Sequence, residues 1–283
     1  MTYKNVFKHL LFVVCVVVLH VACHPKASTI TILHTNDTHS QVDPIEKGKR
    51  DGTFAGYARR MGFIQQERIV SPELILLDAG DFSQGTPYFN FYHGRVEVDA
   101  LNQMGYDAVT LGNHEFDNGV DTLAEVLKDA QFAVLSANYD VRNTPLEGIV
   151  QPFTILTRDG VRVGILGVGV DPTGLIAERN FAPVRYLDPI ASVQHVASEL
   201  KNRYHCDVII CISHLGTEHA NAQRVSDVQL AKATRYIDVI VGGHTHQIVT
   251  NRYEQNLDGK DVLLTQMGKS GARIGKISLK IGE

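Results

Sequence analysis

The chain has 283 residues, of which 44% are apolar and 20% are charged, as in an ordinary globular protein with a full hydrophobic core. The formal net charge of −4 argues against a general nucleic-acid binder, so no nucleic-acid polymer is expected as a partner. Apolar strands, polar loops and helical stretches alternate from Thr29 onward without an internal repeat or a low-complexity linker. This rhythm is typical of a layered α/β fold, here over a single domain at 29–283.

The first 22 residues have the features of a secretory signal peptide. Two lysines precede the apolar run 10–19, which is shorter than the roughly 20 residues needed to span a bilayer. The segment that ends at Cys23 resembles a bacterial lipoprotein signal, except that His20 stands where an apolar residue is typical. We expect removal of residues 1–22 with lipidation of Cys23, or plain cleavage nearby, followed by a tether at 23–28. The protein would then be exported to the periplasm or cell envelope, and the lipid would anchor it to the membrane.

Six strands are expected, and several are continuous β-branched or leucine-rich runs, which indicates that both of their faces are covered. They are 29–34, 73–78, 107–111, 132–137, 207–212 and 237–241. Helical periodicity appears at 56–70, 95–104, 120–130, 188–203 and 225–234. Asp188 and Pro189 predict the start of one helix, because an aspartate caps and a proline fits the first turn.

Two stretches break this alternation. Residues 152–169 predict a hairpin that turns at Asp159 and Gly160. The C-terminal stretches 262–268 and 272–281 alternate like antiparallel strands at the end of a sheet.

The four cysteines do not predict a structural disulfide. Cys15 lies in the signal peptide, and the lipid would occupy Cys23. Cys206 and Cys211 flank an expected strand, and five steps of ~3.3 Å separate them by more than the ~7 Å limit for bridged Cα atoms. They are expected to be small buried apolar residues.

Five polar motifs follow apolar runs and end in residues that bind metals. They are 32–40, 74–81, 110–119, 207–216 and 238–246. The candidate metal-binding residues in them are Asp37, His39, Asp81, Asn113, His114, His214, His244 and His246. A first-row metal takes about four to six nitrogen and oxygen ligands, so this set fits two ions with one shared carboxylate. Two such ions are the apparatus of metal-assisted phosphate ester hydrolysis.

The position of the motifs supports this interpretation, because ligands of layered α/β sheets gather beyond the carboxyl ends of strands. Asp37 and His39 are one residue apart, so in an extended loop both side chains would leave the same face. Asp81 follows a glycine that permits a sharp turn, and it is the candidate bridge. His244 and His246 have the same one-residue spacing and could divide between two ions.

Three other positions have distinct expectations. Asn113 offers an amide oxygen to a metal or an N–H to a phosphate oxygen. Asp78 either supports the site or caps its turn. His34 lies inside the first strand, so it is expected in the core or near the site.

His114 and Asp117 predict a different chemistry. Three residues apart at the start of a turn or helix, their side chains can touch. A carboxylate that accepts the imidazole proton fixes the tautomer and raises the basicity of the ring. Such a histidine can stabilise charge on the phosphoryl group and protonate the leaving oxygen.

The five motifs, together with the segment 55–60, resemble the metallophosphatase domain of the 5′-nucleotidase family, within the calcineurin-like phosphoesterases. The resemblance covers roughly residues 29–283 and implies a four-layer α/β/β/α sandwich. It implies a catalytic dyad of His114 and Asp117, and in-line attack on phosphorus by a metal-activated water or hydroxide. By the same resemblance, one metal would be held by Asp37, His39, Asp81 and His246, and the other by Asp81, Asn113, His214 and His244. Asn113 and His114 would contact the substrate.

Members of the family that act on nucleotides have a second, C-terminal domain that binds the base, and this sequence stops before it. The main hypothesis is therefore a two-metal phosphoesterase with 5′-nucleotides or related esters as substrates, with a separately encoded nucleotide-binding domain as a candidate partner. The alternative is a non-catalytic, metal-containing binding module at the cell surface. The ligand types admit Zn, Mn, Fe or Co.

Overall fold

The computed structural model describes residues 28–46, 55–219 and 224–282, and its strands build two six-stranded sheets and one small sheet. The first sheet has the order β14-β1-β2-β3-β4-β6. Its strands are β1 (Ser28–Thr35), β2 (Ile75–Asp78), β3 (Ala108–Thr110), β4 (Ala133–Leu135), β6 (Val150–Gln151) and β14 (Gly275–Ile281). All neighbouring pairs are parallel except β14 with β1.

The second sheet has the order β12-β13-β11-β10-β8-β7. Its strands are β7 (Phe153–Arg158), β8 (Val161–Val168), β10 (Val208–Ser213), β11 (Val239–Gly242), β12 (Ile248–Gln255) and β13 (Asp261–Met267). The four central strands are parallel, and the two edge strands run antiparallel to their neighbours. The small sheet pairs β5 (Tyr139–Asp140) with β9 (Arg185–Tyr186).

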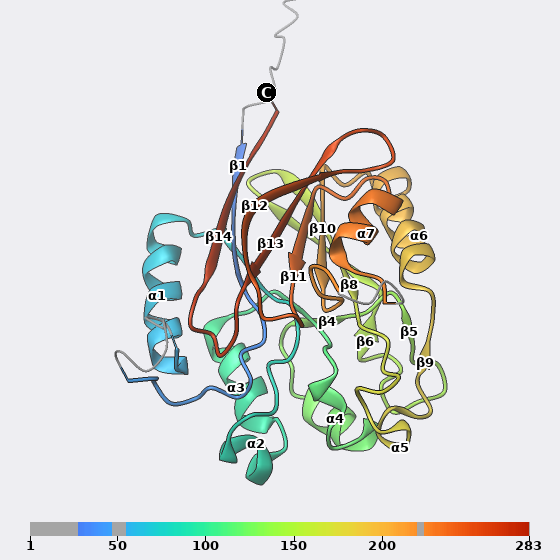
Figure 1. Ribbon diagram of the computed structural model, residues 1–283. Coiled ribbons are helices and arrows are strands. Elements are labelled where there is room, and N and C mark those ends of the chain that lie inside the picture. The colour runs from blue at the N-terminus through green and yellow to red at the C-terminus, as the bar shows by residue number, and fades with distance from the viewer. Residues whose placement is uncertain (1–27, 47–54, 220–223, 283) are drawn as a thin grey trace, which may run out of the picture.

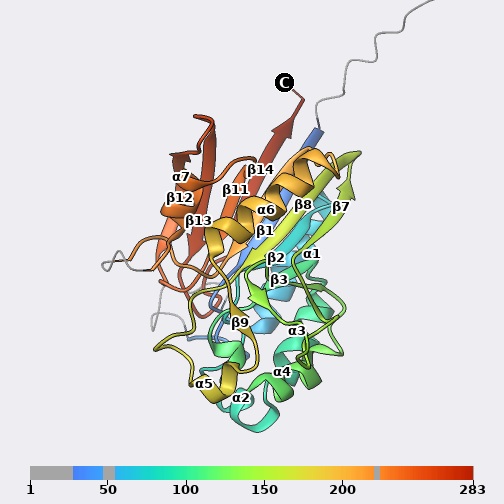
Figure 2. The same cartoon turned by 90° about the vertical axis from the view of Figure 1, so that its right-hand side faces the viewer.

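Helices cover the outer faces of both sheets (Figure 1). The helices of the N-terminal half are α1 (Tyr57–Val70), α2 (Pro87–Tyr92), α3 (Arg95–Met104), the 3₁₀ turn η1 (His114–Phe116) and α4 (Val120–Leu127). The later ones are α5 (Glu178–Phe181), α6 (Pro189–Asn202) and α7 (Asp227–Ala233). In the turned view of Figure 2, α6 lies across the second sheet, and α1 lies on the far side of the first. The expected four-layer α/β/β/α sandwich is confirmed.

Three apolar clusters fill the spaces between the four layers. Strand β10 shows why its run is apolar throughout: Ile209 and Cys211 face the cluster under α6 and α7, whereas Ile210 and Ile212 face the other sheet. Successive strand residues point to opposite faces, so a strand covered on both sides has no polar alternation. This burial accounts for the continuous apolar runs in the sequence.

Local signals in the sequence located several element boundaries. The Asp188 side chain accepts a hydrogen bond from the Ala191 N–H at the start of α6, as the cap predicts. Asp159 and Gly160 have φ angles of 49° and 79°, so they form the predicted turn between β7 and β8. Among the described residues, Cys206 and Cys211 are buried and unbridged.

The expectation for the C-terminal stretches was partly right. Strand β14 is an antiparallel strand at the edge of the first sheet, beside β1, whereas β13 lies inside the second sheet, antiparallel to β12 and parallel to β11. Other elements were missed. Strand β12 and helices α2 and α5 had no matching prediction. Residue Ser28, assigned to the tether, already belongs to β1.

The predicted signal peptide, Cys23 and the rest of the tether lie outside the described residues. No helix within the described ranges is long and apolar enough to cross a membrane.

Candidate metal centre

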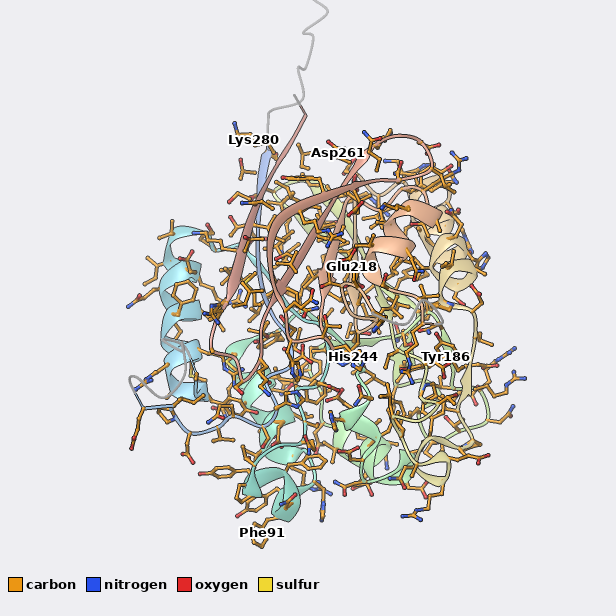
Figure 3. All side chains as sticks on the ribbon, viewed as in Figure 1. Phe91, Tyr186, Glu218, His244, Asp261 and Lys280 are labelled. Carbon is orange, nitrogen blue, oxygen red and sulfur yellow. The ribbon has the colours of Figure 1, made fainter. Side chains whose placement is uncertain are left out.

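The five polar motifs meet at one edge of the two sheets, beyond the carboxyl ends of β1, β2, β3, β10 and β11. The His244 side chain lies near the middle of the molecule, below the end of β11 and above α2 and α4 (Figure 3). Within each sheet, these five strands run parallel to one another, so their carboxyl ends lie at the same edge of the sheet. The topology therefore brings together residues more than 200 positions apart.

Within the described residues, the candidate ligands form three overlapping groups whose donor atoms lie within 4.8 Å of one another. The groups are Asp37 with His39 and His246, Asp81 with His214 and His244, and His39 with Asp81 and His114. The two histidines of the last motif fall into different groups, as their predicted division between two ions requires. Asp81 belongs to two groups, which is the position expected of a bridging carboxylate.

The donor atoms face one another in a way that suits a cation. Nε2 of His39 lies 3.0 Å from Nε2 of His246, and Nε2 of His246 lies 3.3 Å from Oδ1 of Asp37. Nδ1 of His214 lies 2.6 Å from the Ala79 carbonyl oxygen and donates to it, which leaves Nε2 facing Asp81, 3.1 Å away, as the nitrogen that a cation could take. This second-sphere bond is the usual way of orienting a metal-binding imidazole.

A buried amide oxygen gives independent support for a cation here. Asn113 is 5% exposed, and its Oδ1 has no hydrogen-bond partner in the described structure. A buried acceptor without a partner is costly, and a metal ion would satisfy it. The donor set of imidazole nitrogen with carboxylate and amide oxygen fits Zn²⁺, Mn²⁺, Fe²⁺ or Co²⁺.

Electrostatics point in the same direction. Burial opposes a positive charge on His214, but the nearby Asp81 and Asp37 carboxylates raise its pKa. Burial likewise opposes the charged form of Asp81, and the adjoining His214 nevertheless lowers the pKa of this carboxyl group. Burial, reinforced by the neighbouring His214, lowers the pKa of His244 to about 3, which keeps this imidazole neutral. The centre therefore favours positive charge beside its carboxylates, carried by His214 in the metal-free protein, while the His244 imidazole stays neutral and able to donate to a cation.

The backbone of these loops is not extended, contrary to the sequence-based expectation. Asp37 and His39 both have φ of 47°, and His244 and His246 have φ of 71° and 55°. These left-handed conformations are unfavourable for residues with a Cβ, and they persist where the surrounding structure holds them. The side chains of each pair converge because the loops curl, and not because they alternate along an extended strand.

The predicted dyad forms a close contact. Nδ1 of His114 lies 2.8 Å from Oδ2 of Asp117, and both side chains are about one-third exposed, at 32% and 33%. Burial alone would lower the pKa of His114, but the hydrogen bond to Asp117 and the charge of Asp81 raise it. The contact favours a protonated imidazole that is open to a substrate.

Two buried residues that organise the centre were not among the sequence-based candidates. Both carboxylate oxygens of Glu115 accept backbone N–H bonds, from Asp81 and Gly112 at one oxygen and from Ser83 at the other, at 2.7–3.0 Å. The carboxylate thus joins the second motif to the third.

The other is Asn36, whose side-chain N–H groups bond to Oδ2 of Asp37 and to the carbonyl oxygen of Gly268. Its amide oxygen accepts the N–H of Met267. Both Glu115 and Asn36 stand beside a candidate ligand in sequence, but nothing in a local pattern indicates which distant backbone groups they contact.

Of their expected roles, Asp78 has that of a turn cap and His34 that of a core residue. Asp78 accepts hydrogen bonds from the Thr35 hydroxyl and the Gly80 N–H, so it caps the turn that leads to Asp81. His34 is fully buried, and its Nε2 lies 3.2 Å from the Thr265 hydroxyl. His219, which is not among the candidate ligands, is half-buried, and its ring centre lies 6.0 Å from that of His244.

A family model and individual relatives of known function point to the same family. Residues 30–248 match the family model for calcineurin-like phosphoesterases. A snake venom 5′-nucleotidase from Crotalus adamanteus is 33% identical over 273 residues, which cover 88% of this chain and 45% of that protein. The 5′-nucleotidase of Rattus norvegicus is 35% identical over 249 residues, which cover 84% of this chain and 41% of the relative.

A solved structure agrees with these relatives. The 5′-nucleotidase precursor from Thermus thermophilus superimposes with a TM-score of 0.79 at 34% identity, over 89% of this chain and 51% of that one. The chain thus spans about half the length of the relatives it matches. The family model covers most of the sequence, and the solved structure shares its sheets and helices. The chain belongs to the calcineurin-like phosphoesterase family.

Proposed function

We propose that this protein hydrolyses phosphate esters with two divalent metal ions, and that 5′-nucleotides or related esters are its substrates. The observation that carries the proposal is the convergence of Asp37, His39 and His246 in one group and of Asp81, His214 and His244 in another. The 5′-nucleotidases among its relatives support the substrate class.

The two groups, with Asp81 shared between them and Asn113 beside the second, are the proposed ligands of the two ions. When bound, the ions would polarise the phosphoryl oxygens and activate water for in-line attack on phosphorus. Asn113 and His114 would contact the phosphoryl group. Both stand at the end of β3, where the partnerless amide oxygen and the dyad lie side by side along the chain.

His114 would carry the proton that the leaving group needs. Asp117 accepts its Nδ1–H, so Nε2 is the ring atom available to protonate the leaving oxygen. Burial lowers the pKa of His114, but the hydrogen bond to Asp117 and the charge of Asp81 raise it above the ordinary value, which favours the protonated ring. The backbone N–H of His114 also bonds to Oδ1 of Asp81 at 2.9 Å, which fixes the dyad relative to the proposed bridging carboxylate.

The proposal is tested with the purified mature chain loaded with Mn²⁺, Co²⁺ or Zn²⁺. Hydrolysis of 4-nitrophenyl phosphate, its bis-ester and AMP would be measured alongside the metal content by elemental analysis. We expect two ions per chain and turnover of at least one ester. A folded sample that contains both metals and hydrolyses none of these esters would reject the proposal.

A separately encoded nucleotide-binding domain is proposed to complete the nucleotide site. The relatives are about twice as long as the matched region, which is the reason for looking for a second component. The chain alone should then hydrolyse 4-nitrophenyl phosphate and AMP with similar efficiency, and a partner should raise the efficiency toward AMP. Strong selectivity for AMP in the isolated chain would contradict this part of the proposal.

We further propose that the protein is exported and held at the membrane by a lipid on Cys23. The signal-like sequence before Cys23 supports this location, and a venom enzyme among the relatives is consistent with export. Mass spectrometry of the protein expressed in a bacterium should find the diacylglyceryl group on Cys23, and Cys23→Ser should release the protein from the membrane fraction. An unmodified Cys23 in the membrane-associated protein would refute lipidation.

A further inference from the structure

The strand β13 contributes no candidate metal ligand, yet one of its side chains bonds to the fifth motif and to Thr217, the residue that follows the fourth motif. Gln266 is fully buried beside the end of β11. Its Nε2 donates to the carbonyl oxygen of Gly243 at 2.6 Å and to the hydroxyl of Thr217 at 3.2 Å. Its Oε1 accepts from the N–H of Gln247 at 2.6 Å and from the hydroxyl of Thr245 at 3.1 Å.

These four bonds use every donor of the amide and both acceptor positions of its oxygen. They also determine its orientation, because the Gly243 carbonyl can only accept and the Gln247 N–H can only donate. A rotated amide would place like groups against each other at both ends. A buried side chain with all its hydrogen bonds made in one orientation is a rigid connector.

The backbone groups that it holds lie immediately before His244 and immediately after His246. Between them the two histidines keep left-handed φ angles of 71° and 55°. Residues with a Cβ remain in this region when other contacts over-determine the backbone. The bond to Thr217 connects the same amide to the residue that follows the motif of His214, and the Thr217 N–H in turn bonds to the Thr245 hydroxyl at 3.2 Å.

We propose that Gln266 is a positioning residue that sets the placement of His244 and His246 relative to His214 and Asp37. This inference rests on the proposed metal centre and adds a residue to it from outside the five motifs. Removal of Gln266 would let the histidine loop relax from its left-handed conformation. Outer residues of this kind change metal affinity by about 10–100-fold when they are lost.

The direct test uses Mn²⁺ as the probe and metal-free full-length mature protein. Gln266→Met has a similar volume and makes none of the four bonds. In calorimetric titrations, Mn²⁺ affinity should fall by about 10–100-fold in at least one of the two sites. The electron paramagnetic resonance signal of two coupled Mn²⁺ ions, present in the wild type, should weaken or disappear, while circular dichroism of the folded chain stays the same.

The matched control is Gln194→Met on α6. Gln194 is half-buried and also makes side-chain bonds, to the Ser198 hydroxyl and the Arg235 N–H, but it contacts none of the five motifs. This variant should bind Mn²⁺ as the wild type does. An equal loss of affinity in Gln194→Met would mean that general destabilisation, and not positioning, explains the effect.

A second variant covers the case in which Gln266→Met does not fold. Gln266→Glu retains the acceptor for Gln247 but, as a carboxylate, loses both donated bonds, so it should also bind Mn²⁺ more weakly. Wild-type affinity and a wild-type coupled signal in a folded Gln266 variant would overturn the inference. Failure of the wild-type protein to bind two Mn²⁺ ions would overturn the proposed function itself, so the two failures are distinguishable.

Discussion

Nδ1 of His114 and Oδ2 of Asp117 lie 2.8 Å apart across the 3₁₀ turn that follows β3. This contact orients the imidazole and stabilises its charged form. A metal centre that served only to hold the fold together would have no need of it. It therefore separates the proposed hydrolase from a non-catalytic metal-binding module.

The first prediction concerns this dyad. His114→Ala should lower kcat by about 10²-fold or more, because the leaving oxygen loses its proton donor. The metal content by elemental analysis should stay at the wild-type level, because other residues hold both ions in the proposed ligand sets. Steady-state kinetics with 4-nitrophenyl phosphate would measure the effect. An unchanged kcat would show that His114 is not the acid.

The second prediction concerns the close contact of Gly112 with the centre. A Cβ on Gly112 would lie 2.2 Å from Oδ1 of Asp81 and 2.7 Å from Nε2 of His214. Gly112→Ala should therefore displace these side chains and weaken metal binding, measured by calorimetry.

The control for Gly112→Ala is Gly62→Ala in α1, where a Cβ would meet nothing within 4 Å. This change should leave metal binding intact and stabilise the chain by roughly 0.5–1 kcal/mol, because alanine loses less entropy in a helix. Equal metal affinity in the two variants would mean that the close approach of Gly112 to Asp81 and His214 does not matter for metal binding.

The third prediction concerns Glu115. The carboxylate of Glu115 accepts hydrogen bonds from three backbone N–H groups. In Glu115→Gln the side-chain NH₂ would face some of these N–H groups, donor against donor. The free energy of unfolding of the metal-free protein should fall by about 1–3 kcal/mol, the usual cost of leaving buried groups unpaired. Urea denaturation would measure it.

The control is Glu147→Gln, which alters an exposed side chain that accepts one bond, from the Asn143 N–H. It should change the free energy of unfolding by a few tenths of a kcal/mol at most, within about 0.5 kcal/mol of the wild type. Glu115→Gln with wild-type stability would show that the carboxylate does not join the two motifs.

The fourth prediction concerns pH. Burial lowers the pKa of His34 to about 4 from its ordinary value of 6.5. Between these values the unfolded chain binds a proton that the folded chain does not, so this residue makes stability fall as the pH falls. Its contribution is about 1.4 kcal/mol per pH unit at most.

His34→Gln should therefore reduce the loss of stability between pH 6.5 and 4.5 relative to the wild type, in urea denaturation at several pH values. Buried carboxyl groups with raised pKa values act on stability in the opposite direction, but they are present in both proteins. Their contribution therefore cancels when His34→Gln is compared with the wild type. His195→Gln, which removes an exposed histidine on α6, should follow the wild-type profile. If the stability of His34→Gln changed with pH in the same way as that of the wild type, His34 would not contribute to the pH dependence.

Much of this molecule could be predicted from local patterns. The apolar runs located six of the strands, because a strand between two layers must be apolar on both faces. The sequence also identified the candidate ligands and the His114–Asp117 contact, since each lies within a few residues of its strand end or its partner. These features depend on short stretches of chain whose periodicity and residue types are visible in the sequence.

What only the tertiary structure decided is how those pieces are arranged and held. Strand β13 could not be assigned to its parallel place beside β11, and the curled loops of Asp37 and His244 could not be distinguished from extended ones. Gln266 stood unnoticed in an ordinary strand pattern. Its role comes from hydrogen bonds to groups up to 49 positions away, and such bonds exist only after the topology has brought the two segments together. The sequence alone determined which side chains are available for the chemistry. The order of the strands determined where those side chains meet, because a buried polar group finds its partners in space and not along the chain.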